Sequence, residues 1–596
     1  MTVDPVNLAG DLDNIGQGDL SLSEVIQNAT ILQASGNHTE AQALYKDWIN
    51  KTESSDKYAA YYNLGVSLAE QGMVDEAEKA YRASIEHNPE FIQAYLNLGL
   101  ALERQGRVEQ AIKLWTKVID QKETVPKESI IFALNNIGRV SEALREFDAS
   151  EKALLASLQL NPNQTGVLQH IVSGRQRQCK WPIIVNLPTN RAHELLASTS
   201  ALSMLAEADD PALQWLASQT TLNRFSPKED YLASGKKYNH SKVRIGYLSG
   251  DLCTHAVGVL MADIIDAHDR QKFEIYAFDY SPEDGTIFRS NLKKSFNYFF
   301  DIRNIDDRDA AFIILNNEID VLIDLHGWSS GARPGILSLR PAPLQITYLG
   351  YFGSTLSPWI DYVITDRFVF KDEILPYFSE KPLYIDGTVI PLGYSEFIRT
   401  KLTRESVGLP KNSIILACFN NINKVNPAIF QTWMNIINKT NNTLLWLLDD
   451  NPWATNNLKL EAKKYGLDDR ISFAPRTNLN DYRERMQLAD LYLDTFPYNA
   501  GSTAKDVIDM RLPMLTCAGR TPISRMAGSI MHSLNLSNFI VRDLIEYEER
   551  AIDLIQDNRS LSEARHKLMN LSGTLAERPI RFVRSLEHQI NCIIHK

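Results

Sequence analysis

The chain is poor in cysteine, with five in 596 residues, and no two of them form a CxxC pair. This scattering argues against a disulfide framework and a structural zinc site, and it is typical of a reducing compartment. No run of about 18 apolar residues is present, so no segment is predicted to cross a membrane. The first residues, MTVDPVNLAGDLDN, lack the apolar stretch of a signal peptide, so we expect a cytoplasmic protein.

An excess of positive charge is also absent, because the formal net charge is −11. Nonspecific binding to nucleic acid or to anionic membranes is therefore not expected, although a local basic cleft is compatible with this charge. The sequence contains no Walker A motif, no GxSxG and no HExxH. The nearest Asp-x-Asp, Asp307-Arg308-Asp309, lies in a polar run that is typical of a helix start. These absences favour group transfer without a metal or a cofactor.

A repeat of 34 residues is present in the N-terminal part of the chain. Small and aromatic residues recur at this spacing: Tyr61, Leu64, Gly65, Gly72, Ala77 and Tyr81 return as Tyr95, Leu98, Gly99, Gly106, Ala111 and Trp115. Such a pattern is typical of tetratricopeptide repeats. We predict a loose leader at 1–20 and about four repeats at 21–165, which form an α-solenoid with a concave binding face.

Three of the repeats carry asparagine two residues before the glycine, at Asn63, Asn97 and Asn136. On stacked inner helices these amides would form a ladder able to hydrogen-bond an extended peptide backbone. Alternatively, asparagine is simply common at this place in such repeats.

From Lys242 onward, continuous apolar runs alternate with helical segments, which predicts parallel sheets covered on both faces. The first set of runs is VRIGYLSGD, FEIYAFDY, IDVLIDLHG and LQITYLGY, and the second is SIILACFN, TLLWLLDD, RISFAP, ADLYLD and LPMLTCAG. We predict a helical bridge at 166–240 and two facing Rossmann-like lobes at 241–398 and 399–578. A terminal helix at 579–596 is expected to pack back on them.

The stretch DLYLDTFPYNAGSTAKD combines a strand at Asp490–Asp494, a turn with Gly501, the pair Ser502-Thr503 and a helix from Ala504. A helix start of this kind offers free N–H groups and a positive dipole end to an anion. The alternative is an ordinary strand-to-helix turn with a Ser or Thr N-cap.

His255 and Lys424 each follow a predicted strand. The imidazole of His255 could take a proton from an attacking hydroxyl or hydrogen-bond a substrate, although a single loop histidine is often structural. Lys424, near Asn421, could stabilise the negative charge of a departing diphosphate, or it could be a solvated surface lysine.

The run RTNLNDYRERMQLAD contains Thr477 and places Tyr482 and Arg485 on one helical face. These two side chains suit a flat nucleobase, but they could equally be a packing pair between helices. Asp506, one turn into the helix after Gly501, could bond ribose hydroxyls.

The chain resembles the O-GlcNAc transferase family, the family 41 glycosyltransferases, over roughly residues 242–595. The motifs that carry the resemblance are EDGTIFR, GARPGILSLRPAPLQITYLGY, CFNNINKVNP, QLADLYLDTFPYNAGSTAKD and GRTPISRMAGSI. The resemblance implies a GT-B fold and metal-free, inverting transfer of a sugar from a nucleotide diphosphate to Ser or Thr of proteins. It implies nucleotide sugar and polypeptides as partners, with the polypeptides bound along the repeats.

The resemblance also implies roles for residues of the second lobe and for one histidine. His255 matches the active-site histidine of the first lobe, which acts either as base or as substrate contact. Lys424 matches the lysine that contacts the diphosphate, and Asn421 stands beside the diphosphate, where related transferases have Gln. Ser502 and Thr503 match the phosphate-binding pair.

Further residues match positions around the rest of the donor. Asp506 matches the ribose-binding aspartate, and Tyr482 stands where a histidine stacks on uracil. Arg485 matches the arginine nearby, and Leu349-Gly350 aligns with backbone that lines the sugar pocket.

Some positions depart from the animal enzymes of this family. Gly501 stands where they place a histidine, and FNN with DTFPY is similar to the plant protein O-fucosyltransferases that use GDP-fucose. GRTPISRMAGS and EDGTIFR follow the UDP-sugar branch, so we expect UDP-GlcNAc as donor in a bacterial-type member. The alternatives are GDP-fucose, UDP-glucose transfer to Asn, or a non-catalytic repeat adaptor.

Overall fold

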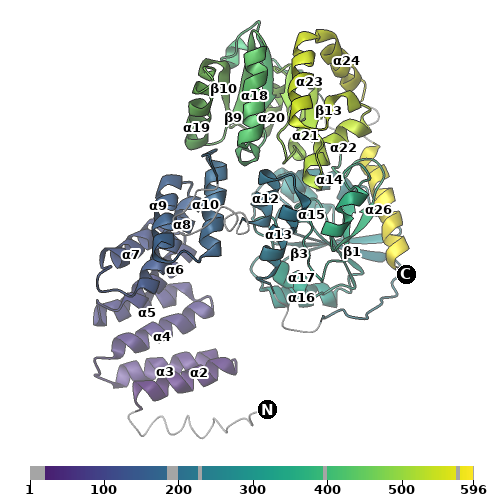
Figure 1. The fold of residues 1–596 in the computed structure, drawn as a ribbon. Coiled ribbons are helices and arrows are strands. Elements are labelled where there is room, and N and C mark those ends of the chain that lie inside the picture. Colours follow the sequence, from purple (N-terminus) through teal and green to yellow (C-terminus); the bar gives the residue numbers. More distant parts are fainter. Residues whose placement is uncertain are drawn as a thin grey trace. The chain divides into compact units, whose positions relative to one another are not determined.

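The computed structural model describes residues 20–183, 199–225, 231–393, 397, 399–571 and 577–594. The chain divides into two compact units, Met1–Gly174 and Arg175–Lys596 (Figure 1). All but the last residue of the predicted leader at 1–20 lies outside the described residues.

The first unit is a stack of helix pairs (Figure 1). The helices pair in chain order: α2 (Leu22–Ala34) with α3 (His38–Lys51), α4 (Lys57–Glu70) with α5 (Val74–His87), α6 (Ile92–Arg104) with α7 (Val108–Asp120), and α8 (Lys127–Ala143) with α9 (Phe147–Leu160). A further helix, α10 (Thr165–Arg177), follows the last pair. The predicted helical repeat region is thus confirmed.

The repeating glycine lies where the two helices of a pair touch. A Cβ added to Gly65 would overlap the Tyr81 ring, and one added to Gly99 would overlap the Trp115 indole. Trp115 is fully buried, and its Nε1 donates a hydrogen bond to the carbonyl of Leu96 at 3.2 Å. The 34-residue period therefore places a glycine against a large aromatic side chain in these two successive helix pairs.

Asn63, Asn97 and Asn136 lie on the first helices of their pairs and are half-buried. The side-chain nitrogens of Asn63 and Asn136 each donate to the carbonyl four residues earlier in their own helix. The nitrogen of Asn97 instead donates to the hydroxyl of Tyr62 at 3.1 Å. Their contact with a peptide stays a prediction.

The first lobe of the second unit is a parallel sheet in the order β3-β2-β1-β4-β5-β6-β7. Its strands are β1 (Val243–Ser249), β2 (Phe273–Asp279), β3 (Tyr298–Asp301), β4 (Val321–Asp324), β5 (Leu344–Thr347), β6 (Tyr362–Thr365) and β7 (Lys381–Tyr384). Its helices are α14 (Ala256–Asp266), α15 (Ile287–Lys294), α16 (Asp307–Asn316) and α17 (Pro334–Ser338).

The second lobe is a parallel sheet in the order β10-β9-β8-β11-β12-β13. Its strands are β8 (Ile414–Cys418), β9 (Thr443–Asp449), β10 (Ile471–Pro475), β11 (Leu491–Leu493), β12 (Met514–Cys517) and β13 (Ile540–Val541). Its helices are α18 (Pro427–Lys439), α19 (Pro452–Lys463), α20 (Leu479–Met486), α21 (Ser502–Asp509), α22 (Met526–Ser533), α23 (Leu544–Gln556) and α24 (Asn558–Met569).

The apolar strands have the burial that the sequence predicts. Leu445, Trp446 and Leu447 follow one another in β9 and all are buried, because both faces of the sheet are covered. In each sheet the chain first adds strands toward one edge and then crosses back to add strands toward the other. The change of direction lies between β1 and β4 in the first sheet and between β8 and β11 in the second. Ligands of open α/β sheets bind outside the strand ends at such points. Two lobes of this kind confirm the expected GT-B architecture.

The bridge is bonded to both lobes. Asp209 accepts hydrogen bonds from the backbone N–H groups of Arg520 (2.7 Å) and Thr521 (2.9 Å) in the second lobe. Ser218 shares a hydrogen bond of 2.9 Å with the hydroxyl of Tyr351 in the first lobe. Within the predicted bridge range, 166–240, the described helices are most of α10, then α12 (Ala201–Glu207) and α13 (Pro211–Leu222), and the two compact units divide inside α10.

The helix near the end of the chain, α26 (Arg578–Ile594), returns to the first lobe, where it packs on α14 and β7. The ring of Phe582 lies 5.8 Å from that of Tyr348, between centroids. Nδ1 of His268 lies 3.0 Å from a carboxylate oxygen of Glu587, and both side chains are buried. The expectation that this helix packs back on the lobes is met.

We expect Gly99→Ala to lower the free energy of unfolding of the repeat unit by about 1–3 kcal/mol, because the new methyl overlaps Trp115. Gly166→Ala is the matched control, since Gly166 is exposed in α10 and has nothing within 4 Å of an added Cβ. It should leave stability unchanged or raise it by up to about 1 kcal/mol. Urea unfolding followed by circular dichroism measures both, and equal effects would contradict the packing argument.

Candidate active site

A buried carboxylate, Asp494, lies directly after β11 at the switch point of the second lobe. It accepts hydrogen bonds from the backbone N–H of Ala500 and the hydroxyl of Thr516, both at 2.8 Å. The side-chain nitrogen of Asn420, which follows β8, donates to it at 3.0 Å. The pKa of Asp494 is raised to about 6, chiefly by burial. The hydrogen bonds just named and the positive charge of the nearby Lys424 oppose this rise. The carboxylate therefore ties together the ends of β8, β11 and β12.

Lys424 is the last residue of a short 3-10 helix, η3 (Ile422–Lys424), that follows β8. Its Nζ donates to the backbone carbonyl of Asn499 at 3.0 Å and lies 4.0 Å from the ring centroid of Tyr498. Burial lowers the pKa of Lys424 to about 8. The ammonium group is thus held against the loop that leads into α21 by one carbonyl and one ring face.

Helix α21 starts directly after this loop. Gly501 occupies the N-cap position, and no side chain caps the helix, so Ser502 and Thr503 are its first helical residues rather than its cap. The nearest neighbours of an added Cβ at Gly501 would be Met526 at 3.7 Å and Ile390 at 4.0 Å. The first N–H groups of a helix have no partner within it, and its positive dipole end favours an anion.

Asp506 lies one turn into α21 and forms an ion pair with Arg483 of α20, whose Nε donates to it at 2.9 Å. Burial raises the pKa of Asp506, and the charge of Arg483 opposes the rise. Arg485 donates to the backbone carbonyl of Pro475. The guanidinium beside Asp506 is therefore that of Arg483, which the sequence patterns did not single out.

The other predicted nucleotide contacts lie around the same strand ends. Tyr482 packs on Phe419 with ring centroids 6.1 Å apart, and burial raises its pKa well above the usual value. Thr477 is exposed, and its hydroxyl donates to Asp481 at 3.1 Å. Asn421 is exposed at the N-cap position of η3. Their contact with a nucleotide stays a prediction.

In the first lobe, His255 is the N-cap residue of α14, and half of its side chain is exposed. Its Nδ1 lies 3.4 Å from the backbone nitrogen of Val257 and 3.3 Å from a carboxylate oxygen of Asp251. Nδ1 accepts the N–H of Val257 in this arrangement; a hydrogen on Nδ1 would instead bond Asp251 and leave Nε2 to accept a proton. The signal for Asp251 was its place four residues before the histidine in SGDLCTH.

A second histidine, His326, follows β4 and is buried. Its Nε2 accepts a hydrogen bond from the backbone N–H of Gly250 at 2.9 Å, and its Nδ1 lies 2.9 Å from the hydroxyl of Ser329. Burial lowers the pKa of His326, which favours the neutral ring, and the nearby charge of Asp251 opposes this shift. Its Nε2 also lies 3.4 Å from the Asp251 carboxylate. Asp251 therefore stands between the two histidines.

Leu349 and Gly350 come after β5, beside the end of β4. Leu349 has a positive φ of 71°, and an added Cβ at Gly350 would overlap the backbone of Leu325 and His326. Only glycine fits this close approach of two backbones.

The lobes meet through α14 and α21, the helices that start after His255 and at Ser502. Asp263 of α14 is buried enough to raise its pKa, and the charge of Lys505 in α21 opposes the rise. The structure thus gathers Lys424, the start of α21 and Asp506 on one lobe. It places His255 with Asp251 on the facing lobe.

Within the described ranges, no group of three or more His, Cys, Asp or Glu side chains is arranged to hold a metal ion. None of the helices in these ranges is long and apolar enough to cross a membrane. The five cysteines are free thiols, and all except Cys592 are buried.

Comparison with known families identifies both units. A profile of the tetratricopeptide repeat matches residues 26–90 and 62–124. The profile described as glycosyl transferase family 41 matches residues 224–396 and 394–576, which is more than half of the chain.

Relatives of the chain come from plants and animals. The chain is 32% identical over 356 residues to the Arabidopsis thaliana protein named "Probable UDP-N-acetylglucosamine--peptide N-acetylglucosaminyltransferase SEC", covering 58% of this chain and 36% of that protein. It is 24% identical over 444 residues to the Caenorhabditis elegans "UDP-N-acetylglucosamine--peptide N-acetylglucosaminyltransferase", covering 55% and 39%. The chain therefore spans less than two fifths of the length of these relatives.

Among solved structures, a mutant of the Thermobaculum terrenum O-GlcNAc transferase superposes with a TM-score of 0.62. The match covers 100% of this chain and 99% of that one at 18% sequence identity, so the two share a fold. The family profile and the motifs at the strand ends agree, and the chain belongs to glycosyl transferase family 41.

Proposed function

We propose that the chain is an inverting, metal-independent glycosyltransferase of the cytoplasm that moves GlcNAc from UDP-GlcNAc to Ser or Thr hydroxyls of proteins. The names of its relatives in family 41 and of its structural neighbour support this choice of donor and acceptor. The observation that carries the proposal is the Lys424 ammonium, held at the switch point beside the start of α21.

In this reaction the acceptor oxygen attacks the anomeric carbon as the bond from that carbon to the diphosphate oxygen breaks. A single displacement from the face opposite the leaving group inverts the anomeric centre. The negative charge that develops on the departing UDP lies against Lys424 and the first N–H groups of α21. These are fixed donors, so little reorganisation accompanies the charge transfer.

The hydroxyl proton goes to His255 if that residue is the base, through the Nε2 that has no hydrogen-bond partner among the described residues. The imidazolium that forms is then stabilised by Asp251 at Nδ1, 3.3 Å away. In the other role, His255 orients the acceptor hydroxyl by a hydrogen bond.

We assign the donor's uridine to the region where α20 approaches α21. Tyr482, already packed on Phe419, offers a ring for the base, and Arg485 a guanidinium for its edge. Asp506 is assigned to the ribose hydroxyls, with Arg483 fixing the carboxylate. Leu349-Gly350 lines the sugar, and polypeptide acceptors bind along the repeat groove that carries Asn63, Asn97 and Asn136.

The function is tested by incubating the full chain with UDP-GlcNAc, UDP-glucose and GDP-fucose and measuring nucleotide release with Ser/Thr and Asn peptides. We expect release from UDP-GlcNAc with a Ser/Thr peptide to be at least about tenfold faster than from the other donors. Faster turnover of GDP-fucose, or transfer to Asn, would replace the proposed donor or linkage. Binding of UDP without turnover of any donor would indicate an adaptor.

We expect Lys424→Ala to reduce kcat by about 100- to 1,000-fold, because one preorganised cation at the leaving group is lost. Lys464→Ala is the matched control, since Lys464 is two-thirds exposed and pairs only with Glu461 among the described residues. It should keep full activity. Steady-state kinetics with thermal unfolding as a check on folding distinguish the variants, and unchanged turnover in Lys424→Ala would remove the assigned role.

The lowered pKa of Lys424 makes a prediction for the pH profile. The ammonium is charged below its pKa of about 8 and loses its proton as pH rises through that value. We therefore expect kcat/KM, which reports the free enzyme, to fall about tenfold per pH unit above this point. In Lys424→Arg the residual activity should lack this limb, because arginine stays charged. A wild-type limb near the pKa of an ordinary lysine would contradict the burial argument.

A further inference from the structure

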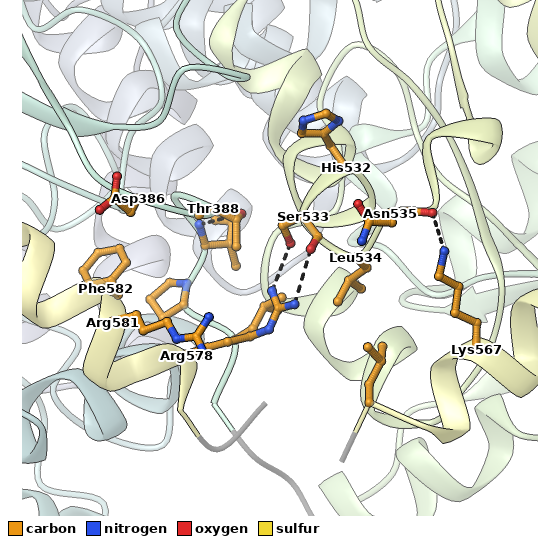
Figure 2. A pocket seen from close by; sticks show the side chains of 15 residues that line it. Asp386, Thr388, His532, Ser533, Leu534, Asn535, Lys567, Arg578, Arg581 and Phe582 are labelled. Carbon is orange, nitrogen blue, oxygen red and sulfur yellow. Dashed lines mark hydrogen bonds between the residues drawn. The ribbon is translucent and has the colours of Figure 1, made fainter. Parts of the chain in front are cut away.

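A pocket with a volume of about 660 Å³ lies where the two lobes join, and neither Lys424 nor Ser502 at the start of α21 lines it (Figure 2). One wall is the segment Asp386–Leu392, which follows β7 and leaves the first lobe. The opposite wall is the turn at the end of α22, and the remaining walls come from α24 and α26. None of the residues assigned to donor or acceptor lines it.

The pocket is rich in positive charge. Figure 2 shows Arg578 with its guanidinium turned toward Ser533, whose hydroxyl and carbonyl accept hydrogen bonds at 3.1 and 3.3 Å. Lys567 donates to the carbonyl of Asn535 at 2.7 Å. In the described part of the chain neither cation pairs with a carboxylate. Each is held in place by neutral oxygen atoms.

The acids near the pocket do not neutralise these cations. Glu577 pairs with Arg581 at 2.7 Å. Asp386 is the acidic side chain among the described lining residues, and it lies across the pocket from Lys567 in Figure 2. Burial lowers the pKa of Arg578, and the neighbouring charge of Arg581 lowers it further. A partly buried cation of this kind gains most from an anionic partner.

The rest of the lining is apolar. Leu534, Phe582 and Ile390 are buried and face the same space as the two cations. The lining therefore fits a ligand with an anionic head and a small apolar body.

We propose that this pocket binds a small organic oxyanion, a phosphate or carboxylate on an apolar body, through Arg578 and Lys567 at a site separate from the donor site. Such a ligand touches the segment that leaves the first lobe, the second lobe and α26 together. Ile390 also borders the Gly501 turn, so the two sites share a wall.

The proposal is tested by calorimetric titration of the full chain with phenyl phosphate, with benzoate and with phenol. We expect the two anions to bind and phenol not to bind. Whichever anion binds more tightly identifies the head group. Equal affinity for phenol would overturn the proposal, because the cations would then have no role, and so would the failure of both anions to bind.

Variants locate the binding. Arg578→Gln and Lys567→Gln should each weaken the anion at least about tenfold, since each removes a charge-assisted hydrogen bond. Lys567 is exposed, so its variant keeps the test valid if Arg578→Gln unfolds. Arg559→Gln is the control, because Arg559 is exposed on α24 and pairs with Glu563. It should bind as the wild type does.

The last variant separates this site from the proposed active site. Lys424→Ala should bind phenyl phosphate normally even though it is expected to lose transfer. Loss of binding in Lys424→Ala with retention in Arg578→Gln and Lys567→Gln would place the anion at the donor site and overturn the proposal. Neither result depends on whether the chain transfers GlcNAc.

Discussion

A carboxylate without solvent contact, Asp494, determines the form of the second lobe's ligand-facing edge. Ionised aspartate is costly to bury unless donors surround it, and the chain supplies them from β8, β12 and the loop after β11. Satisfying this one group fixes the loop that carries Asn499, whose carbonyl holds Lys424. The position of the lysine and the free start of α21 thus both follow from the same buried charge.

Much of the architecture could be predicted from the sequence, because its repeats and apolar runs extend over many residues and do not depend on any single one. The 34-residue period and apolar runs such as that of β9 are examples. The strands β3, β6, β7 and β13 were not predicted. They have two to four residues each, several of them half-buried or exposed, so their pairing depends on neighbours distant in the chain.

The sequence predicted which residues lie at the strand ends of the candidate site. It did not predict which of these side chains contact one another. The spacing of residues in the sequence favoured Arg485 as a nucleotide contact. In the structure, where α20 approaches α21, it is Arg483 that forms the ion pair with Asp506. His326 lay inside a run that read as a buried strand end, and only the meeting of β1 with β4 brings it to Asp251. The bridge shows the same limit, since nothing local marks Asp209 as the acceptor for a loop of the second lobe.

The return of α26 to the first lobe has a consequence for biosynthesis. His268 and Glu587, which meet in that lobe's interior, are separated by 319 residues. The part of the first lobe that α26 covers, around α14 and the edge strand β7, therefore stays exposed while the whole second lobe is translated. A chain that ended shortly before α26 would contain both sheets but would lack the partner that Glu587 provides for the buried His268.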